Sequence, residues 1–268
     1  MDPETAAPRR RFDGRVAIVA GSSLDPSIGR STATRLAREG ASVIINGRSE
    51  EPLRAAEKDM LDAGLDVTAV GGSLEDDDTP ARLVDAAAER YGRIDAVVNT
   101  VGGTRYRGSP RDIDRAAYLD TVELNTWSSI ALVQQALRRG LADGGGAVVN
   151  VSSGTVNKTT PSMIAYAAAK AALNAVTRTL ARDLGPLGVR VNAVAPGLTK
   201  TSATRAMWES DDGAGAGSNL VLGRLTTADD IANACVFLLS DEAASITGVV
   251  IDVDGGNHLQ SGGWTPMA

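Results

Sequence analysis

The stretch VAIVAGSSLDPSIG, residues 16–29, decides the fold. Its first five residues are apolar and end at Gly21, the pattern of a short strand buried on both faces. The residues after Gly29 have the period of an amphipathic helix. A glycine-bearing turn between such a strand and helix directs backbone N–H groups and the positive end of the helix dipole at a pyrophosphate. The stretch therefore predicts a phosphate-binding turn, with an ordinary connecting loop as the alternative because a middle glycine is lacking.

The same alternation continues along the chain. Further apolar runs rich in Val and Ile predict strands at 42–46, 67–70, 94–98, 147–151, 189–194 and 249–253. The stretches between them predict helices, among them 30–39, 52–63, 80–91 and 165–184. Strands that alternate with helices predict a doubly wound α/β fold, in which a seven-stranded parallel sheet carries helices on both faces.

One domain is predicted over residues 12–257. The polar residues 1–11 predict a disordered N-terminal tail, and residues 258–268 a C-terminal tail. Inside the domain, the sequence DDGAGAGS at 211–218 has no period and lies where binding loops fall in such sheets. We expect a mobile lid at about 202–222, with an inert surface loop as the alternative.

The charge and the counts of Cys and His exclude several classes of protein. The 268 residues include 27 Lys and Arg against 33 Asp and Glu, a net charge of −6 without a basic block, so no nucleic-acid partner is expected. One Cys and one His exclude a disulfide framework and a zinc site of nitrogen and sulfur ligands, and no metal is expected. No apolar run approaches the roughly 18 residues of a membrane helix, so we expect no membrane partner and a cytoplasmic location.

The end of the second predicted strand bears on the choice of cofactor. A site specific for NAD(H) places Asp or Glu there to bind the ribose 2′-hydroxyl. The chain instead reads NGRS at 46–49, and Arg48 is suited to a charge-assisted contact with a 2′-phosphate. We therefore expect NADP(H) as the preferred cofactor and NAD(H) as the alternative. A solvated arginine that pairs with Glu50 or Glu51 is the competing interpretation.

Tyr166 and Lys170 form a catalytic pattern. They stand four residues apart in a predicted helix and so lie on one face. A nearby ammonium stabilises a phenolate, so we expect the pKa of Tyr166 to fall from about 10 toward neutrality, which suits a general acid or base. Ser152 and Ser153 end the preceding predicted strand. An incidental helix contact is the alternative, since pairs at this spacing are common.

These features together resemble the short-chain dehydrogenase/reductase family, the single-domain Rossmann-fold group, over nearly the whole chain. The residues that carry the resemblance follow in order: Asn99, Gly102, Asn125, Ser153, Tyr166, Lys170, Pro196-Gly197, Thr201, Gly223-Arg224-Leu225 and Asp254-Gly255-Gly256. The resemblance implies that Ser153, favoured over Ser152 by its spacing, bonds the substrate carbonyl oxygen and that Tyr166 transfers the proton. It implies that Lys170 lowers the pKa of the tyrosine and holds the nicotinamide ribose, and that Asn125 holds a water linking Lys170 to solvent.

The resemblance also implies a set of cofactor contacts. Thr201 and the Pro196-Gly197 turn would position the nicotinamide and its phosphates. Ser73-Leu74 stand where the family usually has an Asp beside the adenine. The complete expected set is Gly21, Ser23, Ser27, Ile28, Gly29, Arg48, Ser73, Leu74, Asn99, Gly102, Tyr166, Lys170, Pro196, Gly197 and Thr201.

The turn departs from the family's pattern. Ala20 replaces the usual Thr, the turn is two residues longer, and Ser27 stands at the middle glycine. This form is similar to the turn of enoyl-thioester reductases in the same superfamily. Those enzymes space their Tyr and Lys seven apart, whereas the residue seven after Tyr166 is Leu173. The active-site spacing therefore favours carbonyl chemistry over enoyl chemistry.

We expect an NADP(H)-dependent oxidoreductase that interconverts a ketone or aldehyde and its alcohol, a 3-oxoacyl or polyketide-type ketone being among the candidate substrates. Enoyl-thioester reduction and a non-catalytic nucleotide sensor are the alternatives, and sensors typically lose the Tyr or the Lys. The family resemblance implies a homotetramer or homodimer. Arg105 and Arg107 flank Tyr106 on an expected substrate loop. They suit an anionic or thioester-carrier substrate, although two solvent-facing arginines are the favoured interpretation.

Overall fold

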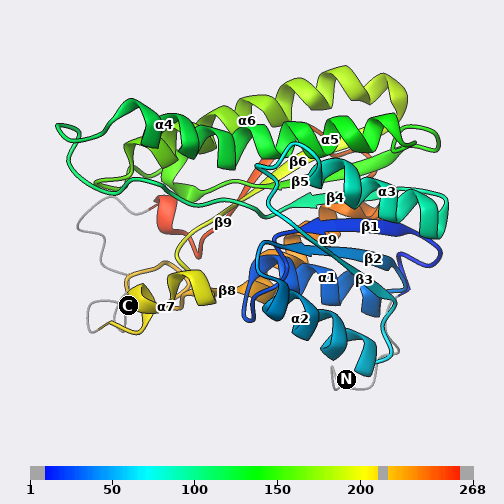
Figure 1. The fold of residues 1–268 in the computed structure, drawn as a ribbon. Helices are drawn as coiled ribbons and strands as arrows, with labels where there is room; N and C mark the ends of the chain where they lie inside the picture. Colours follow the sequence, from blue (N-terminus) through cyan, green and yellow to red (C-terminus); the bar gives the residue numbers. More distant parts are fainter. Residues whose placement is uncertain (1–9, 211–216, 260–268) are drawn as a thin grey trace.

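The computed structural model describes residues 10–210 and 217–259. Seven strands pair in parallel in the order β3-β2-β1-β4-β5-β6-β9 (Figure 1). Their bounds are Val16–Ala20 (β1), Ser42–Gly47 (β2), Val67–Gly71 (β3), Ala96–Asn99 (β4), Gly146–Val151 (β5), Val189–Pro196 (β6) and Val250–Val253 (β9). The strand order reverses between β1 and β4, so the predicted doubly wound Rossmann fold is confirmed.

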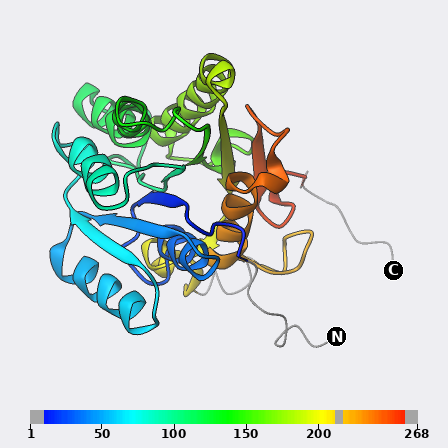
Figure 2. The same cartoon turned by 90° about the vertical axis from the view of Figure 1, so that its right-hand side faces the viewer.

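Helices cover both faces of this sheet, as predicted. One face carries α1 (Ile28–Arg38), α2 (Glu50–Asp62) and α9 (Ala228–Leu239), and the other carries α3 (Thr79–Tyr91), α4 (Arg115–Val122), α5 (Ser128–Arg138) and α6 (Ile164–Leu184). Figure 2 shows the two layers from the side, with blue α1 and α2 below the sheet and the green helices above it. Each layer encloses its own apolar core, with Leu36 and Cys235 in one and Leu83 and Leu132 in the other.

The first turn explains why Ser27 can replace a glycine. Ser27 is the N-cap of α1, and its Oγ accepts a hydrogen bond from the backbone N–H of Arg30 at 3.1 Å. An N-cap side chain of this type satisfies an N–H that has no partner within the helix. Thr100, which follows β4, donates its hydroxyl to the carbonyl oxygens of Ala20 at 2.7 Å and Gly21 at 3.0 Å. The ends of β1 and β4 are thereby joined at the point where the strand order reverses.

Short elements that the sequence did not predict surround the end of β6. β7 (Thr199–Lys200) pairs with β8 (Thr226–Thr227), and the 3₁₀ turn η4 (Ser202–Thr204) leads into the single-turn helix α7 (Arg205–Trp208). The backbone N–H and hydroxyl of Ser202 donate to the carbonyl oxygens of Pro26 and Asp25, both at 2.8 Å. The start of the predicted lid is therefore attached to the first turn, while 211–216 lie outside the described residues.

The described residues extend past both expected domain boundaries. Arg11, placed in the N-terminal tail by the sequence, donates to Glu39 at 2.6 Å and to Glu242 at 2.6 Å. His258, at the start of the predicted C-terminal tail, lies in the 3₁₀ turn η6 (Asn257–Leu259). Residues 1–9 and 260–268 of the two tails lie outside the described residues. Within the part of the chain that is described, no helix has the length and apolar character needed to cross a bilayer.

Candidate functional site

A cavity of about 370 Å³ opens at the carboxyl ends of β1 and β4, where the strand order reverses. This is the position at which open α/β sheets bind their ligands. Ten residues of the expected cofactor set line it: Gly21, Ser23, Ser27, Ile28, Gly29, Arg48, Ser73, Leu74, Gly102 and Thr201. Asn99, Tyr166, Lys170, Pro196 and Gly197, also expected there, are not among its lining residues.

The remainder of the lining was not in the expected cofactor set, although Thr104 and Arg105 belong to the loop that the sequence predicts to face the substrate. The remaining lining residues are Leu24, Asn46, Gly47, Gly72, Thr100, Val101, Gly103, Thr104, Arg105, Leu124 and Ala203. Most of them directly flank a predicted residue in the chain, so the available signal was the position of each loop at a strand end. Asn46 also has a structural contact, because its amide donates to the carbonyl oxygens of Val70 and Gly72, both at 3.0 Å.

Glycines shape the wall of the cavity. A Cβ on Gly29 would lie 2.3 Å from the carbonyl oxygen of Gly21, which itself has φ +83°. A Cβ on Gly102 would lie 2.7 Å from Asn125 Oδ1 and 2.8 Å from Lys170 Nζ. Side chains at these positions would displace backbone or buried polar groups, so the close approach requires glycine. Together with the start of α1, this backbone surface fits the pyrophosphate of a dinucleotide.

Arg48 lines the cavity with an exposed side chain. Glu50, its expected competitor, instead pairs with Arg54, whose Nε donates to the carboxylate at 2.7 Å. Within the described residues, no ion pair joins Arg48 to a carboxylate. The arginine is therefore available to an anionic group of a ligand in the cavity.

Tyr166 and Lys170 lie one turn apart on α6, with Lys170 Nζ 5.8 Å from the centroid of the tyrosine ring. The Lys170 side chain is buried, and its Nζ donates to the carbonyl oxygen of Val151 at 2.8 Å. Burial lowers the pKa of Lys170 to about 7. Burial raises the pKa of Tyr166, although its hydrogen bond with Ser153 acts in the opposite direction. The expected fall of the tyrosine pKa is therefore wrong for this state, because desolvation of the phenol outweighs its hydrogen bond with Ser153.

The two serines at the end of β5 face different surroundings. The hydroxyl of Ser152 donates to Asn174 Oδ1 at 2.5 Å in the protein interior. The Oγ of Ser153 accepts hydrogen bonds from the backbone N–H of Thr155 at 3.2 Å and from its hydroxyl at 3.0 Å. Because both of these contacts use the oxygen of Ser153 as acceptor, its own proton stays available to a partner such as Tyr166 or a substrate oxygen.

Asn125 lies in a π-helical turn, η1 (Glu123–Trp127), that interrupts the path from α4 to α5. Such turns often occur at functional sites. Its amide donates to the carbonyl oxygens of Gly103 and Thr121, both at 2.7 Å, and its Oδ1 accepts from the N–H of Gly103 at 3.1 Å. Asn125 thus fixes the loop that follows β4, and the water-holding role that the family resemblance implies stays a prediction.

The loop after β6 divides into two parts. Thr201 borders the cavity and caps the following turn, with its N–H donating to Thr204 Oγ1 at 3.2 Å. Gly197 instead packs against Asp254, since a Cβ on the glycine would lie 2.8 Å from that residue's Cβ.

Asn99 ends β4 next to the lining residue Thr100, and its buried Nδ2 lacks a hydrogen-bond partner among the described residues.

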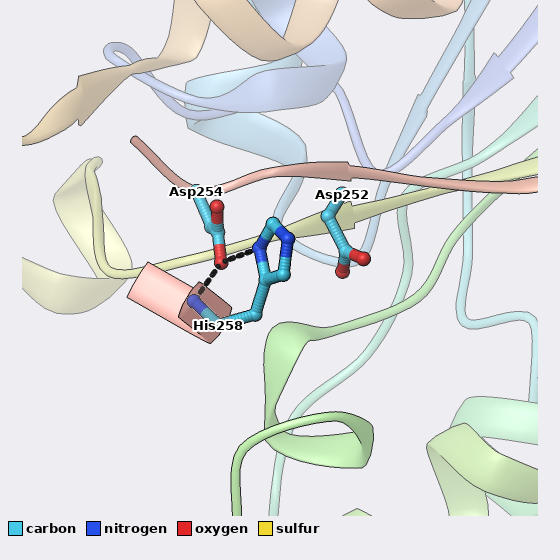
Figure 3. A group of neighbouring side chains, drawn as sticks. All are labelled: Asp252, Asp254 and His258. Atoms are coloured by element: carbon cyan, nitrogen blue, oxygen red, sulfur yellow. Dashed lines mark hydrogen bonds and ion pairs between the residues drawn. The ribbon is translucent and has the colours of Figure 1, made fainter. Parts of the chain in front are cut away.

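A group of three side chains near the C-terminus has the composition of a small metal site. Ligand atoms of Asp252, Asp254 and His258 lie within 4.8 Å of one another, and Figure 3 shows the imidazole between the two carboxylates. The Asp254 carboxylate accepts from the N–H groups of His258 and Gly256 and lies 2.9 Å from His258 Nδ1. Asp252 accepts from the Asn157 amide at 2.8 and 2.9 Å. These contacts account for the carboxylates, and the expectation of no metal stays a prediction.

A parallel Rossmann sheet with a glycine-lined cavity at its reversal point, near a buried Ser153 and Lys170 and a half-buried Tyr166, defines a nucleotide-dependent oxidoreductase. A family model described as enoyl-(acyl carrier protein) reductase matches residues 21–258. A dehydrogenase/reductase SDR family member 4 from Caenorhabditis elegans is 31% identical over 252 residues, covering 92% of this chain and 96% of the relative. A cis-4-hydroxycyclohexanecarboxylate dehydrogenase from Sinomonas cyclohexanicum is 35% identical over 247 residues, covering 91% and 97%.

Comparison with solved structures indicates the same family. A short-chain type dehydrogenase/reductase from Mycobacterium ulcerans has a TM-score of 0.88 and 33% identity, covering 94% of this chain and 92% of that one. The chain belongs to the short-chain dehydrogenase/reductase family. It is therefore an NAD(P)-dependent dehydrogenase/reductase that acts on a small molecule.

Proposed function

We propose that the protein uses NADP(H) to interconvert a ketone or aldehyde and the corresponding alcohol, with Tyr166 as the acid or base. The observation that carries the proposal is the grouping of Tyr166, Ser153 and Lys170 beside the cavity. The Tyr166 phenol is hydrogen-bonded to Ser153, and the Lys170 amine lies within reach of Gly102, which lines the cavity. A bound nicotinamide supplies or accepts the hydride at the carbon that bears the substrate oxygen.

The three side chains have separable tasks. Ser153 donates its proton to the substrate oxygen in place of Tyr166, because Thr155 already supplies two donors to its Oγ. The raised pKa of Tyr166 keeps the phenol protonated at neutral pH, which suits a proton donor in reduction. Lys170, with a pKa of about 7, carries part of its positive charge at that pH and stabilises the phenolate left after transfer. The protonated phenol is the form of Tyr166 that carbonyl reduction requires.

Enoyl-thioester reduction is the second candidate, and the description of the matching family model favours it. The spacing of Tyr166 and Lys170 opposes it, since the position seven residues after the tyrosine is Leu173, a buried core residue. The test is to supply NADPH with a 3-oxoacyl thioester, the matching 2-enoyl thioester and simple ketones. Consumption of NADPH with the 3-oxoacyl thioester or a ketone supports the proposal. Consumption with the enoyl thioester alone would overturn it.

The preference for NADP(H) rests on Arg48. Its guanidinium borders the cavity without a carboxylate partner among the described residues, and no acidic side chain ends β2. A 2′-phosphate supplies the missing anion, whereas a ribose hydroxyl does not.

We further propose that the protein is a homotetramer or homodimer. Large apolar side chains are exposed on elements that contact one another, α4, η1 and α6. Among them, Leu119 is 44% exposed, Trp127 50% and Ile164 50%. Exposed apolar side chains gathered on adjoining elements are typical of protein interfaces. Light scattering after size-exclusion chromatography measures the mass, and a purely monomeric protein at micromolar concentration would contradict the proposal.

A further inference from the structure

Arg105 and Arg107, two arginines of the loop after β4, have different partners although they are only two residues apart in the sequence. Arg105 Nη2 donates to both carboxylate oxygens of Glu75, at 2.7 and 2.9 Å. Its charge is therefore compensated at the rim of the cofactor cavity, where Arg105 itself is a lining residue. Arg107 has an exposed side chain, and within the described residues it forms no ion pair.

The loop's own hydrogen bonds produce this separation. Thr104 donates its hydroxyl to the carbonyl oxygen of Tyr106, and Thr104 Oγ1 accepts a hydrogen bond from the backbone N–H of Tyr106 at 3.2 Å. Two residues further on, the N–H of Gly108 donates to the carbonyl oxygen of Ser162 at 3.2 Å. The loop thus turns at Tyr106 and attaches to the segment that precedes α6, which brings Arg107 close to the start of that helix.

Arg107 contacts two thioethers there. Its Nε lies 3.4 Å from the sulfur of Met163, and its two terminal nitrogens lie 3.9 Å from the sulfur of Met207. Met163 precedes α6 and its carbonyl oxygen accepts from the N–H of Ala167 at 2.8 Å, so it adjoins the first turn, which contains Tyr166. A thioether is a weak acceptor, and it leaves the five N–H donors of a guanidinium free for a stronger one. The exposed guanidinium of Arg107 therefore lies against two thioethers, one at the start of α6, three residues before Tyr166, and one in α7.

We propose that Arg107 is a specificity-determining residue that binds a carboxylate of the substrate, whose reacting carbonyl or alcohol carbon lies at Tyr166. This rests on the proposed function. The substrate class is then an oxo or hydroxy carboxylic acid in which a hydrocarbon skeleton separates the two groups. The planar fork of a guanidinium matches a carboxylate with two parallel hydrogen bonds, and the flanking methionines accept the hydrocarbon. The relative from Sinomonas cyclohexanicum is named for a substrate that combines a hydroxyl and a carboxylate on one ring.

The experiment compares 4-oxocyclohexanecarboxylate with its methyl ester, which removes the charge and keeps the ketone. In the wild type, kcat/KM is expected to be roughly 10- to 100-fold higher for the acid, the effect of one charge-assisted hydrogen-bond pair. Arg107→Met should raise KM for the acid and thereby abolish the preference, whereas kcat/KM for the ester should stay as in the wild type. Arg107→Lys should retain part of the preference for the acid. Arg111→Met, at an exposed arginine of the same loop, is the matched control and should retain the preference.

A binding measurement covers the case in which neither ketone reacts. With saturating NADPH, cyclohexanecarboxylate should raise the melting temperature of the wild type more than cyclohexanecarboxamide does, and Arg107→Met should remove the difference. Equal stabilisation by acid and amide overturns the proposal, as does equal stabilisation by inorganic phosphate, which indicates a general anion site. Turnover of the ester or cyclohexanone without a preference for the acid also overturns the role of Arg107 and leaves the carbonyl chemistry intact. Turnover of enoyl thioesters alone contradicts the proposed function instead.

Discussion

The amine of Lys170 lies 5.8 Å from the centre of the Tyr166 ring and is held by the carbonyl oxygen of Val151 at 2.8 Å. One turn of α6 brings the two side chains together, but the end of β5 determines where the amine points. Lys170 is buried and Tyr166 half-buried, and this desolvation favours the neutral form of each: the pKa of Lys170 falls to about 7 and that of Tyr166 rises. The protein therefore maintains a protonated phenol next to an amine that titrates near neutral pH.

Replacing the phenol tests proton transfer directly. Tyr166→Phe should lower kcat for carbonyl reduction by roughly 10²- to 10⁴-fold, the usual contribution of a general acid. NADPH binding, followed by nicotinamide fluorescence, should change little because Tyr166 does not line the cavity. Undiminished turnover in the variant would show that another group supplies the proton.

The buried amine should make stability depend on pH. The folded-state pKa of Lys170 is about 7, against 10.5 for an unperturbed lysine. Between these values the unfolded chain binds more protons than the folded one, so the free energy of unfolding should rise with pH. Lys170→Met removes this dependence. Urea unfolding without cofactor measures the free energy of unfolding of both proteins from pH 7 to 9.5. The value for the wild type minus the value for the variant should increase as the pH rises. A constant difference would contradict the depressed pKa.

Thr155 is a positioning residue for Ser153. Its hydroxyl donates to Ser153 Oγ at 3.0 Å, so that the serine uses its oxygen as acceptor there and keeps its own proton for Tyr166 or a substrate. Thr155→Val should lower kcat about fivefold, as expected for the loss of one neutral hydrogen bond of about 1 kcal/mol. Thr155→Ser should retain most of the activity, because it keeps the hydroxyl. Equal losses in both variants would indicate that the methyl group matters and the hydrogen bond does not.

Arg48 should discriminate between the two nicotinamide cofactors. Arg48→Asp should weaken NADPH binding by about 10- to 100-fold, since it replaces a charge-assisted contact with repulsion. NADH should be affected little or should bind better, because an acid at the end of β2 suits the ribose hydroxyl. Dissociation constants for both cofactors, measured on wild type and variant, provide the check, with the NADH value as the internal control. A similar loss for both cofactors would assign Arg48 to the structure of the loop.

The sequence by itself determined the architecture of the protein and the chain positions of its site. Apolar runs such as β1 and β5 reveal buried parallel strands, because a strand covered on both faces tolerates few polar residues. The spacing of Tyr166 and Lys170 places them on one helical face, since helix geometry depends only on neighbours along the chain. The expected residues of the first turn line the cavity because parallel strands end at one edge of the sheet, where the loops that follow them meet.

Only the tertiary structure decided the properties that arise from distant contacts and burial. The pairing of Arg105 with Glu75, which leaves Arg107 at the methionines, joins residues 30 positions apart. The direction of the Tyr166 pKa shift follows from the removal of water, which no spacing of residues reveals. The two-residue strands β7 and β8 have no period of their own and exist because the loop after β6 folds back. Chain neighbours set local geometry, whereas charge compensation and desolvation depend on segments that meet only in the folded protein.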